Sequence, residues 1–308
     1  MTIPETTAVI GAGTMGPGIA ATLSRCGSAV RLNDVDESVL ERAKGATDLA
    51  AQVLGRLDAP SAPGGSVSFE PDLEKAVAGA NLVIEAVPEK LELKREVFAK
   101  FEEHVSNETI LATNTSGIPI SDIAAELKHP ERVIGMHWSN PPHLIPMIEV
   151  VPGKKTSDEV RDSLVEIINA FGFAPVVEKE VPGFVENRIL YAILRECVSL
   201  VERGIVTQAD MDTAVKWGIG YKLSVIGPMR LLDMAGLDIY QSVSSYLNRD
   251  LSNEAGVSPL ITERTSQGKL GMKTLGGMYD YADNDDVAKR RAEIAAGLVA
   301  VRKTLSSL

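Results

Sequence analysis

Short apolar runs alternate with longer amphipathic stretches over the first three fifths of the chain. The apolar runs are rich in β-branched residues and predict strands at 8–10, 30–33, 81–87, 109–112, 133–136, 148–151 and 175–181. Apolar residues at helical spacing predict helices between them, at 37–57, 90–104, 121–127 and 157–171. Strands that alternate with helices form βαβ units. This part of the chain therefore predicts an α/β fold, with a mostly parallel, doubly wound sheet of the Rossmann type.

The pattern changes after Val181-Pro182-Gly183. Residues 184–204 carry apolar side chains at helical spacing, with Gly204 as the predicted C-cap. Thr207 is placed to cap the next helix, and Pro228 suits the first turn of a later one. Because no strand-like run follows, we expect two domains: a sheet domain of residues 1–182 and an all-α domain of residues 183–308.

Composition narrows the class of protein. The chain has 308 residues, and its 31 basic against 42 acidic residues give a net charge of −11, which disfavours nucleic acid as a partner. We expect no membrane helix, since no apolar run approaches the required length of about 18–20 residues. The first residues lack the basic region of a signal peptide. Two cysteines, Cys26 and Cys197, are typical of a reducing, cytoplasmic setting.

A glycine-rich turn follows the first predicted strand. Its sequence, Gly11-Ala-Gly13-Thr14-Met15-Gly16, is the G-x-G-x-x-G pattern, and a predicted helix follows it. In that context the glycines allow a tight turn, close approach to a pyrophosphate, and close packing of helix on strand. Asp34 follows the second strand, where a carboxylate would bind ribose hydroxyls and repel a 2′-phosphate. The pattern thus favours NAD over NADP, although Arg31 nearby is a feature that would suit the 2′-phosphate.

His137 stands at the end of the fifth predicted strand, where open α/β sheets bind ligands. Oxidation of an alcohol by NAD needs a base for the hydroxyl proton, and imidazole titrates in the right range. Glu149 lies twelve residues further on, beyond a Pro-Pro turn, and could reach back to hold the imidazole. From spacing alone, a structural histidine is the more common interpretation.

Four motifs together favour a catalytic role for His137 over a structural one. They are GAGTMG, ATNTS at 112–116, the run from His137 through Asn140-Pro-Pro to Glu149, and VPGFVENR at 181–188. In order and spacing they resemble the 3-hydroxyacyl-CoA dehydrogenase family over essentially the whole chain. The resemblance implies that His137 is the catalytic base and Glu149 its partner, while Ser116 and Asn187 order the site. It also implies NAD contacts at Glu89, Lys94, Asn114, Ser116, Asn140 and Lys273. Without the family, Ser116 and Asn187 would be interpreted as capping residues.

The chain departs from the acyl-CoA pattern in the region that contacts coenzyme A in the family, here residues 45–74. That region has one basic residue, Arg56, against the acidic residues Asp48, Asp58, Glu70, Asp72 and Glu74. Phosphates of coenzyme A normally require Lys or Arg neighbours. In addition, Gly117 replaces a serine of the family pattern, and Trp138-Ser139 replaces two phenylalanines.

Other runs, TSGIPI at 115–120, GMHWSNPPHLIPMIEV at 135–150, VPGFVENRILYA at 181–192 and WGIGYK at 217–222, resemble the branch of the family that oxidises pyridine aldehydes. We therefore expect a small carboxylate substrate, with hydride transfer between NAD and a hydroxyl or hydrated aldehyde carbon. Trp138 would be a candidate stacking wall, and His143, Arg188 or Arg195 would meet the carboxylate; core packing and solvated helix faces are the competing interpretations. The alternative substrate is an L-3-hydroxyacyl-CoA such as 3-hydroxybutyryl-CoA.

Other classes remain in view. The β-hydroxyacid dehydrogenases share the glycine motif but use a lysine where this chain has Phe184. The four histidines show no metal-ligand spacing, so no metal is expected. A catalytically silent NAD-binding or structural protein is the alternative of another class, since family relatives serve as lens proteins. Long apolar helices after residue 183 predict a homodimer formed through the C-terminal domain.

Overall fold

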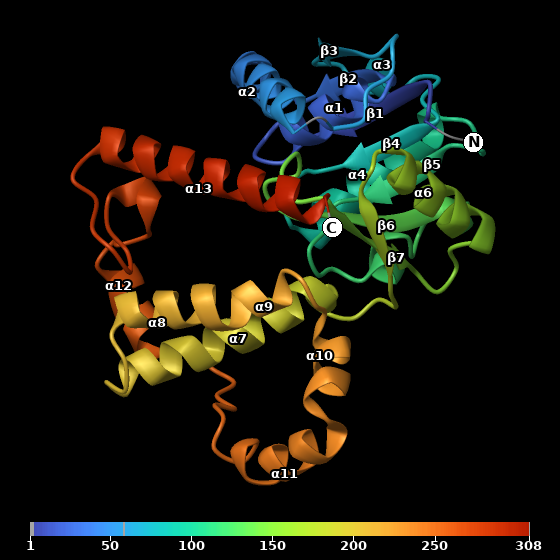
Figure 1. Ribbon diagram of the computed structural model, residues 1–308. Helices are drawn as coiled ribbons and strands as arrows, with labels where there is room; N and C mark the ends of the chain where they lie inside the picture. Colours follow the sequence, from blue (N-terminus) through green and yellow to red (C-terminus); the bar gives the residue numbers. More distant parts are fainter. Residues whose placement is uncertain (1–2, 58, 308) are drawn as a thin grey trace. The chain divides into compact units, whose positions relative to one another are not determined.

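The computed structural model describes residues 3–57 and 59–307. The chain divides between Asn187 and Arg188 into two compact units (Figure 1). Among the described residues, the N-terminal unit holds the whole sheet and the C-terminal unit is built of helices. None of the helices in this described part combines the length and apolar character that a membrane span requires.

One eight-stranded sheet forms the centre of the N-terminal unit. Its strands are β1 (Thr6–Ile10), β2 (Ala29–Asn33), β3 (Ser66–Glu70), β4 (Leu82–Glu85), β5 (Ile110–Thr113), β6 (Val133–Trp138), β7 (Met147–Pro152) and β8 (Ala174–Val177). Their spatial order is β3-β2-β1-β4-β5-β6-β7-β8, and all neighbours are parallel except β6 and β7. The strand order changes direction between β1 and β4, which is where open parallel sheets bind ligands.

Helices cover both faces of this sheet. They are α1 (Gly16–Arg25), α2 (Glu37–Arg56), α3 (Leu73–Val77), α4 (Leu91–His104), α5 (Ile120–Ile123), α6 (Asp158–Ala170) and the 3₁₀ helix η1 (Pro130–Arg132). Successive strand residues point to opposite faces. Val9 of β1 thus packs in one core cluster with α1 and α6, whereas its neighbours Ala8 and Ile10 pack in another with α4 and α5. This arrangement confirms the doubly wound α/β class.

The C-terminal unit continues from α7 (Phe184–Glu202), whose first residues belong to the N-terminal unit. Its further helices are α8 (Gln208–Ala214), η2 (Val215–Gly220), α9 (Tyr221–Leu223), α10 (Pro228–Ala235), α11 (Leu237–Leu247), α12 (Pro259–Ser266), η3 (Met272–Thr274) and α13 (Asn284–Leu305). Thr207 Oγ1 accepts a hydrogen bond from Asp210 N at 3.1 Å, as expected of an N-cap. Gly204 adopts a φ of 67° just after α7, the conformation of a glycine C-cap.

The sequence did not predict β3 or α3. The segment Ser66–Glu70 is an edge strand whose side chains are exposed or half-buried, so it lacks a hydrophobic run. Its place is fixed instead by long-range pairing with β2, for example Val30 with Val67. The other errors are shifts of element ends: α5 begins at Ile120 and is shorter than expected, and β8 ends at Val177.

Candidate active site

The glycine turn lies between β1 and α1 and has the geometry of a dinucleotide site. Gly11 has a φ of 109°, and a Cβ there would lie 2.5 Å from the Ala86 carbonyl oxygen. A Cβ on Gly16 would lie 2.0 Å from the Gly11 oxygen, so the helix packs tightly on the turn. Gly13 is exposed and faces open space, since nothing lies within 4 Å of its Cβ position. The α1 N-terminus has no side-chain cap and no acidic residue in its first turn, so its positive end is available to phosphates. Two further residues complete the turn: Thr14 is exposed, and Met15 is half-buried.

Asp34 follows β2 and is half-buried beside the turn. Its Oδ2 accepts a hydrogen bond from Ala12 N at 3.0 Å, and its Oδ1 accepts one from Asp36 N at 3.1 Å. Arg31, which would have suited a 2′-phosphate, is engaged elsewhere: its guanidinium donates to carbonyl oxygens of Lys75, Ala76 and Ala78. The residues present therefore fit NAD, with a carboxylate and no free guanidinium at the ribose position.

A buried ion pair supports the neighbouring strand ends. Lys94 on α4 is 1% exposed, and its Nζ lies 2.7 Å from Glu85 Oε1 at the end of β4. Burial raises the pKa of the Glu85 carboxyl, while Lys94 acts in the opposite direction. The same ammonium lies 3.2 Å from Glu89, and it contributes with Thr115 to holding the pKa of that carboxyl below its usual value against the effect of burial. Glu89 in turn accepts hydrogen bonds from Thr115 Oγ1 at 2.5 Å and Ser116 N at 2.9 Å.

Lys94 is one of the residues expected to contact the cofactor. In this structure its side chain is 1% exposed, and its ammonium contacts the carboxylates of both Glu85 and Glu89. Glu89 itself is partly exposed and orients the turn that carries Ser116. Lys94 is thus linked to the Ser116 turn through Glu89.

His137 and Glu149 meet across the antiparallel pair β6–β7, in which they are directly opposed. Nδ1 of His137 lies 2.6 Å from Oε2 of Glu149, and both residues are buried. The hydrogen bond fixes the imidazole with Nδ1 towards the carboxylate and leaves Nε2 to exchange a proton with a ligand. The expected proximity of these two residues is therefore present in the structure.

The first turn of α7 completes the surroundings of this dyad. The backbone N–H of Glu186 donates to Glu149 Oε1 at 2.7 Å, and that of Val185 donates to Glu178 Oε1 at 3.1 Å. Free N–H groups at a helix N-terminus suit carboxylates. Phe184 starts the helix with a φ of 49°, a strained conformation for a bulky residue, and its ring centroid lies 5.6 Å from that of His137.

Asn187 and Ser116 also come together, because Asn187 Nδ2 donates to the Ser116 carbonyl oxygen at 3.3 Å. Ser116 is exposed after β5, and Asn187 is half-buried. Asn114 Oδ1 accepts a hydrogen bond from the Trp138 backbone N at 2.8 Å and so ties β5 to β6.

Trp138 does not form a stacking wall. Its side chain is 1% exposed and packs against Phe171 and Phe173, with ring centroids 6.2 and 5.5 Å away. Alternation along β6 explains this: His137 and Trp138 point to opposite faces of the sheet, and the tryptophan enters the core.

Asn140 is exposed, and the His143 ring packs against Gly18 of α1, since a Cβ there would lie 2.9 Å from His143 Nδ1.

Three acidic or hydroxyl side chains near His137 were not predicted as site residues. Ser139 Oγ donates to Glu186 Oε1 at 2.5 Å. Burial raises the pKa of the Glu178 carboxyl, and the charge of Glu149 raises it further, against the effect of His137. The available signal was the position of Glu186, one residue before the expected Asn187 in VPGFVENR, together with the unusual Ser139.

His137, Glu149 and Glu186 are also the described residues whose side-chain nitrogen and oxygen atoms lie close enough to hold a metal ion, within 4.8 Å of one another. His137 Nδ1 and Glu149 Oε2 already share a proton across 2.6 Å. An ion would have to displace that proton, so the arrangement is better suited to acid–base chemistry than to metal ligation.

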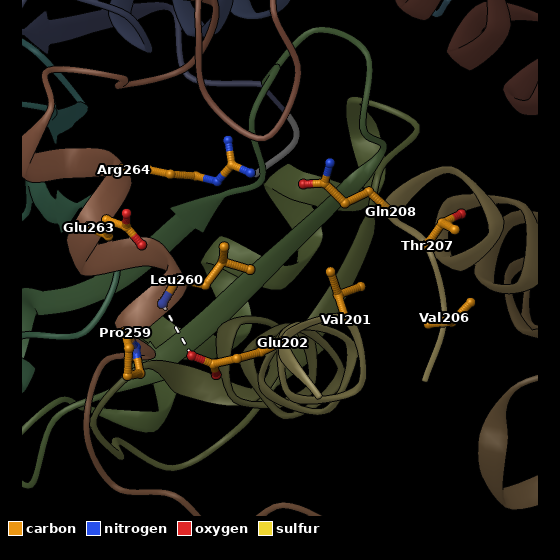
Figure 2. Close-up of a pocket in the computed structure, with 9 residues that line it drawn as sticks. All are labelled: Val201, Glu202, Val206, Thr207, Gln208, Pro259, Leu260, Glu263 and Arg264. Atoms are coloured by element: carbon orange, nitrogen blue, oxygen red, sulfur yellow. Dashed lines mark hydrogen bonds between the residues drawn. The ribbon is translucent and has the colours of Figure 1, made fainter. Parts of the chain in front are cut away.

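The remaining expected residues belong to the C-terminal unit. Arg188 and Arg195 are exposed on α7, and Lys273 is exposed on η3. A pocket of about 520 Å³ in this unit lies among α7, α8 and α12 and includes none of the expected site residues (Figure 2). Its Glu202 accepts a hydrogen bond from Leu260 N at 3.2 Å, which secures the start of α12.

Comparison with known proteins agrees with this geometry. The family model described as "3-hydroxyacyl-CoA dehydrogenase, NAD binding domain" matches residues 6–181, and that described as "3-hydroxyacyl-CoA dehydrogenase, C-terminal domain" matches residues 183–281. The chain belongs to the 3-hydroxyacyl-CoA dehydrogenase family. As a member of it, the protein is an NAD-dependent oxidoreductase acting on hydroxyl or aldehyde groups.

Two relatives show the range within the 3-hydroxyacyl-CoA dehydrogenase family. The 5-formyl-3-hydroxy-2-methylpyridine 4-carboxylate 5-dehydrogenase of Mesorhizobium japonicum is 52% identical over 97% of each chain. A probable 3-hydroxybutyryl-CoA dehydrogenase of Deinococcus radiodurans is 36% identical over 89% of this chain and 99% of its own. A crystal structure of a 5-formyl-3-hydroxy-2-methylpyridine 4-carboxylic acid 5-dehydrogenase, described as an NAD+-dependent dismutase, has a TM-score of 0.95 at 50% identity and covers 99% of both chains.

Proposed function

We propose that this enzyme oxidises a small aromatic aldehyde that carries a carboxylate, of the 5-formyl-3-hydroxy-2-methylpyridine 4-carboxylate type, as its hydrate. The His137–Glu149 pair at 2.6 Å carries the proposal, because it is a proton acceptor held in one orientation. The relative that is 52% identical supports the substrate class. When bound, NAD accepts the hydride from the substrate carbon, or returns it as NADH.

The residues have distinct roles in this proposal. His137 Nε2 takes the proton of the substrate hydroxyl, and the Glu149 carboxylate stabilises the imidazolium that results. Asn187 and Ser116, joined at 3.3 Å, hold the substrate oxygen beside the imidazole. Gly11, Gly13, Gly16, Asp34, Glu89 and Asn140 hold the cofactor. His143, Arg188 or Arg195 pairs with the substrate carboxylate, and Lys273 adds a cofactor contact.

Residues 45–74, the region that contacts coenzyme A in the family, support a substrate without a coenzyme A group. In the described part of residues 45–74, Arg56 is exposed but is outnumbered by carboxylates at Asp48, Glu70, Asp72 and Glu74. The side chain of Asp72 caps α3, accepting hydrogen bonds from Glu74 N and Lys75 N at 3.0 and 3.3 Å. A surface of this charge is unsuited to a pyrophosphate and a 3′-phosphate.

Steady-state assays test the substrate class directly. Purified enzyme is given 5-formyl-3-hydroxy-2-methylpyridine 4-carboxylate with NAD, and acetoacetyl-CoA with NADH, while absorbance of NADH is followed. We expect kcat/KM to be about a hundredfold or more higher for the pyridine aldehyde. Efficient turnover of acetoacetyl-CoA alone would establish the acyl-CoA alternative, and loss of neither activity in His137→Gln would contradict the proposed base.

We also propose that the enzyme is a cytoplasmic homodimer, with residues 1–182 binding NAD and residues 183–308 serving substrate binding and dimerisation. Among the described residues after Asn187, Val287 is the one apolar side chain that is buried. Large apolar side chains are instead exposed on this unit, including Trp217, Tyr221, Val225, Met229, Met234 and Leu237. A second copy of the chain would cover them. The free thiols Cys26 and Cys197 support a reducing compartment.

Sedimentation equilibrium at micromolar concentration tests the dimer. Met229→Glu and Leu237→Glu place charges on the exposed apolar surface, and we expect both to weaken association. Leu49→Glu makes the same change on exposed α2 of the N-terminal unit and serves as the control. A wild-type protein that sediments only as a monomer would rule the dimer out, and fractionation of cells would test the compartment.

A further inference from the structure

A second polar pair lies beside the His137–Glu149 dyad. Ser139 is buried at the turn after β6, and its Oγ donates to Glu186 Oε1 at 2.5 Å. Side-chain atoms of Glu186 lie within 4.8 Å of those of both His137 and Glu149. The backbone of Glu186 also binds Glu149, so the two pairs are fixed relative to each other.

The Glu186 carboxylate is incompletely satisfied. Its Oε2 is shielded from solvent and accepts no hydrogen bond from any of the described residues. An unpaired buried carboxylate oxygen is costly, because it has lost water without gaining a donor. Glu186 Oε2 is therefore the acceptor that this pair offers to a hydroxyl group of a ligand.

The chemistry of aldehyde oxidation provides such a hydroxyl. Water adds to an aldehyde to give a hydrate, whose reacting carbon carries two hydroxyl groups, whereas an alcohol carries one. The dyad has one imidazole nitrogen, Nε2, for one of them. We propose that Glu186 Oε2 accepts a hydrogen bond from the second hydroxyl of the aldehyde hydrate and takes its proton, while Ser139 holds the Glu186 carboxylate in place through Oε1. This role rests on the proposed function.

The atoms and charges balance. The O–H bond of the first hydroxyl breaks and its proton goes to His137 Nε2, while the C–H bond breaks and its electron pair leaves as hydride to oxidised nicotinamide. The first oxygen becomes the carbonyl of a carboxylic acid. The second hydroxyl thereby becomes the acid O–H, and its proton passes to the Glu186 carboxylate. One hydrate and one oxidised cofactor give a carboxylate, a reduced cofactor and two protons, one held on each pair.

The proposed role of Ser139 and Glu186 distinguishes two reactions at the same site, reduction of the free aldehyde and oxidation of its hydrate. Reduction of the free aldehyde to the alcohol involves one oxygen atom on the reacting carbon, which the dyad serves. Oxidation of the hydrate involves two oxygen atoms on that carbon.

Initial rates in each direction test the proposal. Wild type, Ser139→Ala and Glu186→Gln are assayed with 5-formyl-3-hydroxy-2-methylpyridine 4-carboxylate, first with NAD and then with NADH, and acid and alcohol products are measured by NMR. Glu186→Gln keeps the shape and can still bond Ser139, but it cannot take a proton at neutral pH. We expect the kcat of oxidation to fall about a hundredfold and that of reduction by less than about threefold.

Ser121→Ala is the matched control, because Ser121 Oγ donates to Glu180 Oε1 at the same 2.5 Å elsewhere in the N-terminal unit. It should leave the ratio of acid to alcohol unchanged. Equal losses of oxidation and reduction in the Ser139 and Glu186 variants would assign the pair a structural role and overturn the proposal, as would an unchanged ratio. A wild-type enzyme that acts on no aldehyde would overturn the proposed function itself, and this role with it.

Discussion

His137 Nδ1 and Glu149 Oε2 lie 2.6 Å apart because the two residues are directly opposed on the antiparallel strands β6 and β7. Their twelve-residue separation in sequence is closed by the turn that contains the Pro-Pro pair. The backbone N–H of Glu186 holds the second oxygen of the same carboxylate. Sheet register and the first turn of α7 thus fix the carboxylate at both oxygens, so it orients the imidazole rather than merely lying near it.

Replacement of Glu149 by glutamine should abolish most catalysis without disturbing the fold. The amide oxygen can still accept from Glu186 N, but the amide N–H group would then face His137 Nδ1 and favour the tautomer with its proton on Nε2. That nitrogen could no longer act as a base. We expect kcat to fall by about 10²–10⁴. Stopped-flow or steady-state rates measure it, with calorimetric titration of NAD as the test that cofactor binding is intact.

Adding His137→Gln to Glu149→Gln should cost little more than either change alone, because the two groups act as one unit. Additive losses would indicate that Glu149 acts independently of the imidazole. Glu126→Gln, at an exposed position after α5, is the control for loss of a carboxylate.

The dyad and the glycine turn could be predicted from the sequence because their signals are local. Gly11, Gly13 and Gly16 form a pattern with a known backbone requirement, and Asp34 stands at a fixed place after the next strand. His137 and Glu149 were accessible because a Pro-Pro turn between two apolar runs limits how the chain can return. The family motifs then indicated their chemistry.

Residues whose positions depend on long-range packing could not be predicted. Trp138 and His137 are neighbours in sequence, and only the register of β6 decides that the tryptophan enters the core. The burial of Lys94 depends on Glu85 from another element. Strand β3 was missed for the same reason, since pairing with β2 and not hydrophobicity fixes it.

Gly13→Ala should weaken NAD binding without weakening the fold. Gly13 is not among the glycines with positive φ, and its Cβ would meet nothing in the protein. A methyl group there would instead occupy the space that a pyrophosphate approaches. We expect Kd for NAD to rise roughly tenfold or more, equivalent to about 1.4 kcal/mol, with Tm unchanged.

Two further glycine variants serve as comparisons for Gly13→Ala. Gly16→Ala should unfold or strongly destabilise the N-terminal unit, because its Cβ would lie 2.0 Å from a backbone oxygen. Gly45→Ala, within α2 and in open space, should leave NAD affinity as it is and stabilise the helix by about 0.5–1 kcal/mol. An unchanged Kd in Gly13→Ala would remove the turn from the cofactor site.

Lys94→Met should destabilise the protein by about 3–5 kcal/mol, since it leaves the buried Glu85 carboxylate with its hydrogen bonds from Val87 N and Thr113 Oγ1 but without its cationic partner. Urea unfolding measures the loss, and Lys100→Met, exposed on the same helix, should change stability by less than about 0.5 kcal/mol. The double variant Glu85→Gln/Lys94→Met should recover part of the stability. If Lys94→Met were as stable as Lys100→Met, the pair would contribute nothing to the fold.

Glu178→Gln should stabilise the protein, and increasingly so as pH rises. Burial and the charge of Glu149 raise the pKa of Glu178 above its usual value in the folded state. The folded protein therefore binds more protons than the unfolded chain in the window above the usual pKa, so stability falls as pH rises through it. Glutamine never ionises, and its oxygen can still accept from Val185 N, which Glu178 Oε1 now binds at 3.1 Å.

Thermal unfolding followed by circular dichroism gives the comparison. The Tm of Glu178→Gln should equal or fall below that of wild type near pH 4 and exceed it, by less than about 4 °C, near pH 8. Glu126→Gln, on an exposed carboxylate, should show no such trend. A difference in Tm that is constant with pH would mean that Glu178 titrates alike in the folded and unfolded states. The charge of Glu149 would then have no measurable effect on the pKa of Glu178.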